Sequence, residues 1–418
     1  MIKFITENLR WLGAGFLLTF FSGIGQTFFI SLSNDAFREK FNLSHGELAG
    51  IYSAATLASA LILLEFGKIV DRRSVRFSAL VVVGGAALAA FWMSMAWAAW
   101  TLFFGYLGLR LFGQGLMSHV SMTAIGRWFD AYRGRAVSLA ILGYPVSEAL
   151  LPPLAVAGIA TFGVPALWAF GGAVVLFVAG PVLFGLLSEE RTPQTAASHE
   201  VVAEKRSWRR REVLREPSFY LLLVGVLCPG FMATCLFFHQ LHLVEVKGWS
   251  VATFALAFSV FAIAQVGASL LTGGAIDRYS ARALLPIYLI PLGLGLILAW
   301  AVDGEWAVFV VLALVGVTAG IGSALIGALW PELYGIAFLG EIRALAFAAM
   351  VSATAASPVL TGFLIDQGVA FPAQLAAMGV FAIAASGLMA ALQPRLAAIA
   401  LDKGEHNTTK SSPSGDAP

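Results

Sequence analysis

A series of apolar segments, each about twenty residues long, runs through almost the whole sequence. A helix of that length crosses the ~30 Å hydrocarbon core of a bilayer. The composition agrees, because 59% of the 418 residues are hydrophobic and only 12% are charged, whereas a soluble domain carries roughly 25% charged residues. We therefore expect an all-α membrane protein. The formal net charge of +2 gives no reason to expect a nucleic-acid partner.

The sequence divides into twelve such segments. The first has no clear small-residue cleavage site and is followed by further apolar segments, so we interpret it as a membrane span and not as a signal peptide. The spans are expected at about residues 11–32, 47–69, 77–98, 101–125, 136–160, 164–187, 217–241, 251–274, 283–302, 305–330, 343–365 and 371–393.

The lysines and arginines predict the orientation of these spans. If the N-terminus is cytoplasmic, 22 of the 26 basic residues lie on the inner side or in the inner tails. Only Arg38, Lys40 and Lys247 then lie outside, and Arg110 lies within a span. Cytoplasmic loops of membrane proteins carry such an excess of Lys and Arg. We expect an integral protein of the cell (inner) membrane with both termini in the cytoplasm.

A ten-residue loop motif occurs twice, about half a chain apart. Residues 67–76 read GKIVDRRSVR and residues 273–282 read GGAIDRYSAR, with five identical positions. Each copy follows one apolar segment and precedes another, which is typical of a duplicated membrane unit. The predicted organisation is two pseudo-symmetric six-helix halves, at residues 1–187 and 217–394. A polar cytoplasmic linker at residues 188–216 joins them, and a disordered polar tail follows at residues 395–418.

Arg110 is the one basic residue near the middle of a predicted span. A guanidinium near mid-membrane costs several kcal/mol unless it faces a cavity or a partner. On an α-helix, Gln114 lies on the same face as Arg110. Glu148 lies at similar depth in the fifth span, with Tyr144 one turn before it, and is the natural partner of Arg110. Gln26 belongs to a polar face of the first span.

Several interpretations of these polar residues stay open. Arg110 and Glu148 could couple substrate to protons, could form a static ion pair that only specifies packing, or could make no contact. Gln26 could contact a substrate or, like other small and polar side chains in membranes, only mediate helix packing.

The repeated loop resembles the best-known signature of the major facilitator superfamily. That signature is Gly-x3-Asp-Arg-x3-Arg after the second span, and the chain carries a weaker second copy in the other half. Six plus six spans with a central cytoplasmic linker are also similar to this superfamily. The resemblance therefore covers essentially the whole chain. The matching residues are Gly67, Asp71, Arg72 and Arg76, and in the second copy Asp277, Arg278 and Arg282.

Two further patterns point to a branch of that superfamily. Arg110, Gln114 and Gly115 resemble the Arg and Gln-Gly signature in the fourth span of many proton-coupled members. The loops at residues 127–136 and 340–344 look like those of monocarboxylate and oxalate/formate porters. That branch often carries a basic residue in span 8 or 11, and here the strongly polar side chain of span 8 is Gln265.

The resemblance implies a cytoplasmic latch that closes when the protein opens outward. Asp71 would hold the inner helix ends near Arg343, and Asp277 would do so near Arg135. The alternative is that these charges only fix the topology. The expected latch comprises Gly67, Asp71, Arg72, Arg76, Arg135, Asp277, Arg278, Arg282 and Arg343. The resemblance also places spans 1, 4, 7 and 10 around a central cavity, so Gln26 is an expected substrate contact.

These features predict a secondary active transporter that works by alternating access. One hypothesis is proton-coupled transport of a small organic anion such as a monocarboxylate, bound by Arg110. The alternative is proton-driven export of amphipathic compounds or drugs, which the aromatic residues Phe28, Phe29, Phe231, Phe237 and Phe238 favour. A membrane sensor that does not transport is a remote third possibility.

We expect no enzymatic activity and no cofactor, because the sequence has no nucleophile elbow, phosphate loop or metalloprotease motif. Cys228, His239 and His242 align on one face of the seventh span, but Cys228 and His242 are about 21 Å apart on a helix, so we expect no metal site. The expected partners are a small-molecule solute, protons and the lipid bilayer, with the protein itself a monomer.

Overall fold

The computed structural model describes residues 2–129, 132–189, 191 and 207–401, and every regular element among them is a helix. The first half contains α1 (Ile2–Phe21), η1 (Ser22–Gly25), α2 (Thr27–Ile30), η2 (Ser31–Ser33), α3 (Asn34–Phe41), α4 (His45–Phe66), α5 (Ile69–Arg72), α6 (Val75–Ser94), α7 (Ala99–Gly108), η3 (Leu109–Met117), α8 (Ser118–Trp128), α9 (Arg133–Ile141), α10 (Gly143–Val174), η4 (Val175–Ala179) and α11 (Gly180–Leu186). The remainder contains α12 (Arg210–Val213), α13 (Pro217–Phe238), α14 (Gln240–Lys247), α15 (Val251–Tyr279), α16 (Ala281–Leu284), α17 (Ile290–Ala301), α18 (Ala307–Tyr334), α19 (Leu339–Asp366) and α20 (Phe371–Leu401).

Local sequence signals set several helix ends. Ser44 begins α4 with a capping box: its hydroxyl accepts from the Glu47 N–H at 3.1 Å, and the Glu47 carboxylate accepts from the Ser44 N–H at 2.8 Å. The Ser250 hydroxyl caps α15 in a similar way. Such side chains satisfy backbone N–H groups that have no partner within the helix. Gly163, with φ +81°, interrupts α10 between the two spans predicted there, because φ > 0 costs glycine little.

The predicted twelve-helix arrangement in two halves is confirmed. In the described chain, eight helices are long and apolar enough to span a membrane, and Arg133–Leu186 is long enough for two spans. A helix pair bent by 47°, Lys3–Gly25 and Thr27–Phe41, forms the first span. The fourth span is α7, η3 and α8 in succession, and the ninth contains the shorter apolar helix α17.

Some predicted boundaries differ from the structure. Helix α1 begins at Ile2, not at residue 11, and α20 continues to Leu401. The prediction of a disordered tail from residue 395 is therefore wrong for 395–401, because Leu396 and Ile399 continue the buried face of α20. The rest of that tail (402–418) and residues 192–206 of the predicted linker lie outside the described residues.

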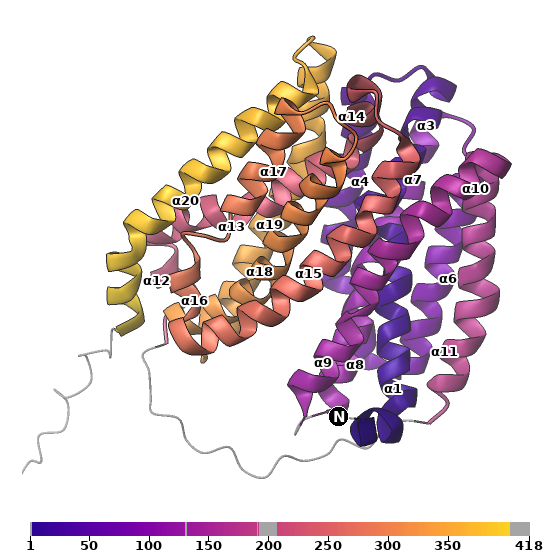
Figure 1. Cartoon of the computed structure of the whole chain (residues 1–418). Coiled ribbons are helices and arrows are strands. Elements are labelled where there is room, and N and C mark those ends of the chain that lie inside the picture. Colours follow the sequence, from indigo (N-terminus) through magenta and orange to yellow (C-terminus); the bar gives the residue numbers. More distant parts are fainter. Residues whose placement is uncertain (1, 130–131, 190, 192–206, 402–418) are drawn as a thin grey trace, which may run out of the picture.

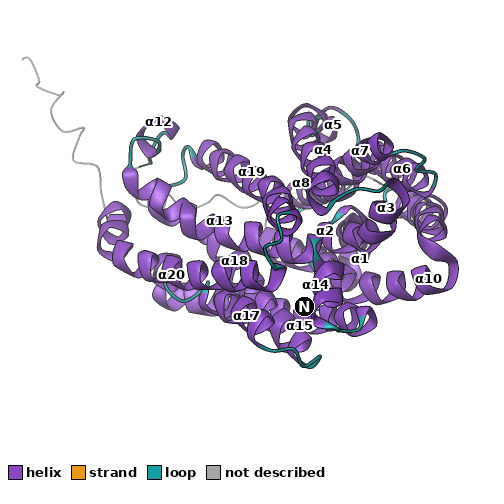
Figure 2. Cartoon of the chain, turned by 90° about the horizontal axis from the view of Figure 1, so that it is seen from above, coloured by secondary structure: helices purple, strands orange, loops and turns teal. Residues whose placement is uncertain are grey.

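The two halves lie side by side and are not parallel (Figures 1 and 2). They meet along α4 with α19 and along α10 with α15. In Figure 1 they are close at the end that carries α3 and α14 and spread apart toward the end that carries the N-terminus, α9 and α16. We call the first the gate end and the second, which holds the two loop motifs, the basic end.

The outer surface of the bundle is apolar. Large side chains such as Leu61, Phe162 and Leu271 are 69%, 75% and 79% exposed. Extensive exposed apolar surface marks a protein that contacts lipid, and the helices satisfy their own backbone polar groups, as the hydrocarbon core requires. This surface agrees with an integral membrane protein.

Candidate functional site

The first span is broken at the level of its glycines. A 3-10 turn covers Ser22–Gly25, and Gln26 adopts an extended conformation with φ −84° and ψ 153° before the helix resumes at Thr27. The sequence predicted a single continuous span here. A break of this kind leaves backbone carbonyl groups without helical partners, and broken membrane helices form the solute and ion sites of many transporters.

The fourth span is irregular at the same level. Residues Leu109–Met117 form a π-helix that contains the whole Arg110 to Gly115 signature. The two irregular segments touch through their backbones: a Cβ added at Gly25 would lie 2.2 Å from the Leu109 carbonyl oxygen and 2.5 Å from the Gln114 nitrogen. Gly25 and Gly113 are therefore needed at this crossing, because a larger residue would force the two spans apart.

Arg110 lies at this crossing and is only 6% exposed. Its Nη1 donates to the Gly25 carbonyl oxygen at 3.3 Å, and its guanidinium lies 5.5 Å from the centre of the Tyr52 ring. Its Nε is buried without a hydrogen-bond partner. No acidic side chain in the described part of the chain forms an ion pair with Arg110, so the predicted partner Glu148 does not neutralise it in this conformation.

Hydrogen bonds through Ser118 link the Tyr144 side chain to the backbone of Gln114. The Tyr144 hydroxyl on α10 donates to the Ser118 hydroxyl on α8, and Ser118 in turn donates to the Gln114 carbonyl oxygen at 2.7 Å. Glu148 lies one turn after Tyr144, and its Oε2 is buried without a hydrogen-bond partner. Both Arg110 and Glu148 thus have buried polar atoms that the described protein groups leave unsatisfied.

The half-buried Gln26 lies directly beside this crossing, since it follows Gly25 in the broken span. Two residues of the site, Gly25 and Tyr52, were not predicted from the sequence. Tyr52 lies against Arg110 and shares a 2.7 Å hydrogen bond with the Thr27 hydroxyl. The Gly23-x-Gly25 pattern in an apolar run was the available signal for the break, whereas nothing local marked Tyr52.

At the basic end, the residues of the loop motifs are bound within their own halves. The Gly67 carbonyl lies 3.1 Å from Nε2 of His119, and the Arg76 guanidinium lies 3.5 Å from the centre of the Phe184 ring. In the second half, Arg282 pairs with Glu332 at 3.2 Å. Two further members also make contacts within one half: Arg278 lies over Tyr279 at 5.1 Å, and Arg343 donates to the Gly327 carbonyl at 2.8 Å.

The expected latch pair of Asp277 with Arg135 is not joined in this conformation. Asp277 and Arg135 are both exposed, and no ion pair connects these two described residues. Arg72 is exposed as well. The side chain of Asp71, expected to pair with Arg343, lies outside the described residues.

The gate end is bound across the halves. Ser31 donates to the Phe237 carbonyl at 2.6 Å, and Gln240 donates to the Phe28 carbonyl at 2.9 Å and to the Ser31 hydroxyl at 2.7 Å. Asp366, the last residue of α19, accepts hydrogen bonds from the Ser44 hydroxyl and from the backbone N–H groups of residues 45 and 46 at the start of α4. The two halves are thus closed at this end.

The comparisons with known proteins agree with this architecture. Among solved structures, the chain is similar to a bacterial homologue of the human lysosomal transporter Spinster in inward-facing occupied and unoccupied conformations. The TM-scores are 0.66 and 0.68 at 16% identity, over 93% of this chain and 94% and 95% of those chains. No curated protein matches the sequence. The family profile described as Major Facilitator Superfamily matches residues 15–255 and 230–415. The protein therefore belongs to this superfamily and is a membrane transporter, not an enzyme.

Proposed function

We propose that the protein transports a small organic anion, such as a monocarboxylate, by alternating access and together with a proton. The observation that carries this proposal is Arg110, a buried cation beside the break in the first span with no ion-pair partner among the described acidic residues. A buried charge is costly until an opposite charge reaches it. A carboxylate substrate bound to the free guanidinium N–H groups would supply that charge.

Glu148 is the proton carrier in this mechanism. Its buried Oε2 lacks a partner, and it lies one turn from Tyr144, whose hydroxyl is linked through Ser118 to the helix of Arg110. When an anion occupies Arg110 and a proton occupies Glu148, both buried charges are neutralised. The loaded carrier then reorients more readily than one carrying a single ligand, and this difference couples the two fluxes. Gln26 and Gln114 offer the solute further hydrogen bonds.

The basic end faces the cytoplasm in this proposal. The excess of Lys and Arg in its loops supports that orientation. We further propose that the protein is a monomer in the cell (inner) membrane. The conformation described above is then inward-facing, with the latch residues of the two halves released. In the outward-facing state Asp71 would approach Arg343, and Asp277 would approach Arg135.

Uptake into proteoliposomes tests the mechanism. We would compare a panel of small carboxylates and lipophilic cations, with and without an inwardly directed proton gradient. We expect a carboxylate to accumulate, Arg110→Gln to reduce its uptake by at least 100-fold, and Glu148→Gln to preserve exchange while abolishing stimulation by the gradient. Arg395→Gln, at a half-exposed arginine that pairs with Glu216 at the basic end of the second half, is the matched control. Uptake that is unaffected by Arg110→Gln would refute the proposal.

A second candidate is proton-driven export of amphipathic compounds. It is favoured by an aromatic cluster between the halves, in which the rings of Phe28 and Phe237 lie 5.7 Å and 5.1 Å from that of Phe258. Such rings would contact an apolar solute on the inner side of the closed gate. In the same assay this reading predicts movement of lipophilic cations only, and Glu148→Gln would uncouple that movement from the gradient.

A further inference from the structure

Three histidines from the two halves meet at the gate end. His45 begins α4 in the first half, while His239 and His242 lie at the junction of α13 and α14 in the second half. The ring of His45 lies 4.3 Å from that of His242 and 5.9 Å from that of His239, between ring centres. Opening of this end must separate His45 from the other two.

Among the described residues, the acidic groups in direct contact with the cluster or its Arg38 neighbour are already engaged, with one exception. Asp35 of α3 pairs with Arg38 at 3.3 Å, and Asp366 of α19 accepts its bonds from the N-terminus of α4. Glu245 of α14 is the exception, 3.9 Å from Nδ1 of His242. From α20 the cluster meets the apolar ring of Phe371. Protonation of a neutral imidazole in this cluster would therefore add positive charge beside Arg38, with few unpaired carboxylates to balance it.

His239 is the most enclosed of the three, at 3% exposure. Its Nε2 lies 3.0 Å from the Pro358 carbonyl, which can only accept, so this nitrogen carries the hydrogen of the neutral ring. Burial lowers the pKa of His239 to about 4. Burial also lowers the pKa of His242, with Glu245 acting in the opposite direction. The closed gate thus favours neutral rings.

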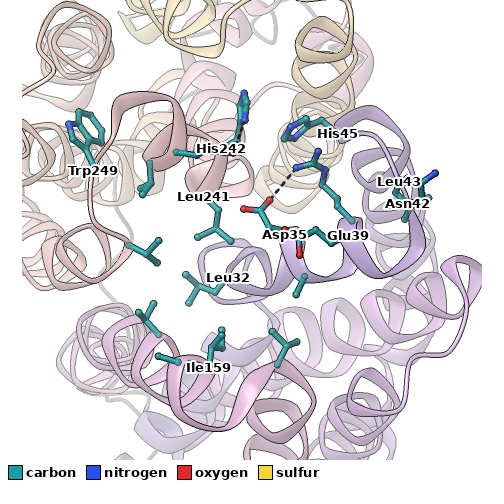
Figure 3. Close-up of a pocket in the computed structure, with 18 residues that line it drawn as sticks. Leu32, Asp35, Glu39, Asn42, Leu43, His45, Ile159, Leu241, His242 and Trp249 are labelled. Carbon is teal, nitrogen blue, oxygen red and sulfur yellow. Dashed lines mark hydrogen bonds and ion pairs between the residues drawn. The ribbon is translucent and has the colours of Figure 1, made fainter.

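Protons can reach the cluster from the gate end. A pocket of about 1010 Å³ opens there between α3, α10 and α14, and both His45 and His242 line it (Figure 3). Glu39 and Glu245 belong to the same pocket and are exposed. His239 lies deeper and shares a smaller adjoining pocket with the other two histidines.

We propose that His45, His239 and His242 form a proton-binding site that stabilises the closed gate when neutral and promotes opening of the gate end when protonated. In the open state the rings would be hydrated and separated, so the repulsion and the desolvation cost of the charged rings would both fall. Acidification on the outer side would then shift the transporter toward its outward-facing state. This inference rests on the proposed alternating access but needs no particular substrate.

The test is a distance measurement across the gate end. Spin labels at Met95→Cys and Val369→Cys, two exposed positions in opposite halves, would report opening by double electron–electron resonance in lipid nanodiscs without solute. The buried Cys228 and Cys235 would be replaced by alanine. If His239 moves from a pKa of about 4 to ~6.5 in water, the open-to-closed ratio rises by up to about 30-fold between pH 7.5 and 5.0.

The substitution of all three histidines by glutamine should reduce that response to about threefold or less. Because this variant could fold poorly, His239→Gln alone provides a second test: its amide can still donate to Pro358, and the response should fall by at least threefold. His119→Gln, at the basic end, should keep the full response. A wild-type gate that ignores pH, or a response lost in Glu148→Gln and kept in the triple variant, would overturn the proposal. A gate that responds in a protein that moves no carboxylate would refute only the proposed function.

Discussion

The two ends of the interface between the halves are held by different chemistry. At the gate end, neutral side chains of one half donate to backbone carbonyls of the other, as in Ser31 to Phe237 and Gln240 to Phe28. At the basic end, charged side chains bind inside their own half, as in Arg282 with Glu332. The gate end is thus closed across the halves, while the described contacts of the basic end hold each half together separately.

This contrast indicates how the closed gate can still open. A neutral hydrogen bond contributes only about 0.5–1.5 kcal/mol net, because water replaces the lost partner. The carboxylate of Asp366 is an exception, since it binds the positive end of the α4 dipole across the interface. We therefore expect close backbone packing and Asp366 to dominate closure, and the following substitutions test that order.

The largest effect is expected from Gly362→Ala. A Cβ at Gly362 would lie 2.8 Å from the His45 carbonyl oxygen, at the crossing of α19 with α4. Overpacking of this kind costs about 1–3 kcal/mol, so the open population should rise by about tenfold or more in the spin-label measurement. Gly340→Ala, in the same helix but at the basic end with no neighbour near its Cβ, is the control. Equal effects of the two substitutions would contradict the role given to this crossing.

The next effect is expected from Asp366→Asn. The substitution removes the negative charge that faces the start of α4 and weakens three hydrogen bonds. A loss of about 1 kcal/mol should raise the open-to-closed ratio about fivefold. Asp303→Asn is the matched control, because Asp303 is exposed and pairs with Lys247 inside the second half. An equal rise in the open-to-closed ratio for Asp303→Asn would contradict the role given to Asp366.

Asp71→Asn and Asp277→Asn should act in the opposite direction. If these carboxylates hold the basic end closed only in the outward-facing state, their loss should disfavour that state by about 1 kcal/mol. The turnover number kcat should then fall several-fold with KM little changed in the uptake assay. A change confined to KM would argue that these residues affect solute binding and do not form a latch.

The smallest effect is expected from Arg282→Gln. Its ion pair with Glu332 is partly exposed and lies within one half, and such pairs contribute about 1 kcal/mol or less. Thermal unfolding should shift down slightly, while the gate-end distances should stay unchanged. A large change in the gate-end distances would show that the basic end does communicate across the halves through this residue.

The sequence was sufficient for the architecture because the lipid environment imposes long apolar helices, and the paired loops at residues 67–76 and 273–282 mark the two halves. It also singled out Arg110, because a charge within an apolar run is conspicuous. It could not predict that Arg110 contacts the Gly25 carbonyl and the Tyr52 ring. The π-helix changes which side chains share a face, and the break at Ser22–Gly25 is hidden in an apolar run. The cluster of His45, His239 and His242 joins positions distant in the chain, so no local pattern revealed it.

The contact between Gly25 and Gly113 has a consequence for how this transporter can evolve. Because backbone meets backbone there, we expect the first and fourth spans to move together. If Gln26 and Gln114 contact the solute as proposed, solute preference can change through these two side chains while the crossing itself stays the same. The two glycines would tolerate almost no replacement, whereas their polar neighbours could diversify. Related transporters with different cargo could therefore retain the same crossing.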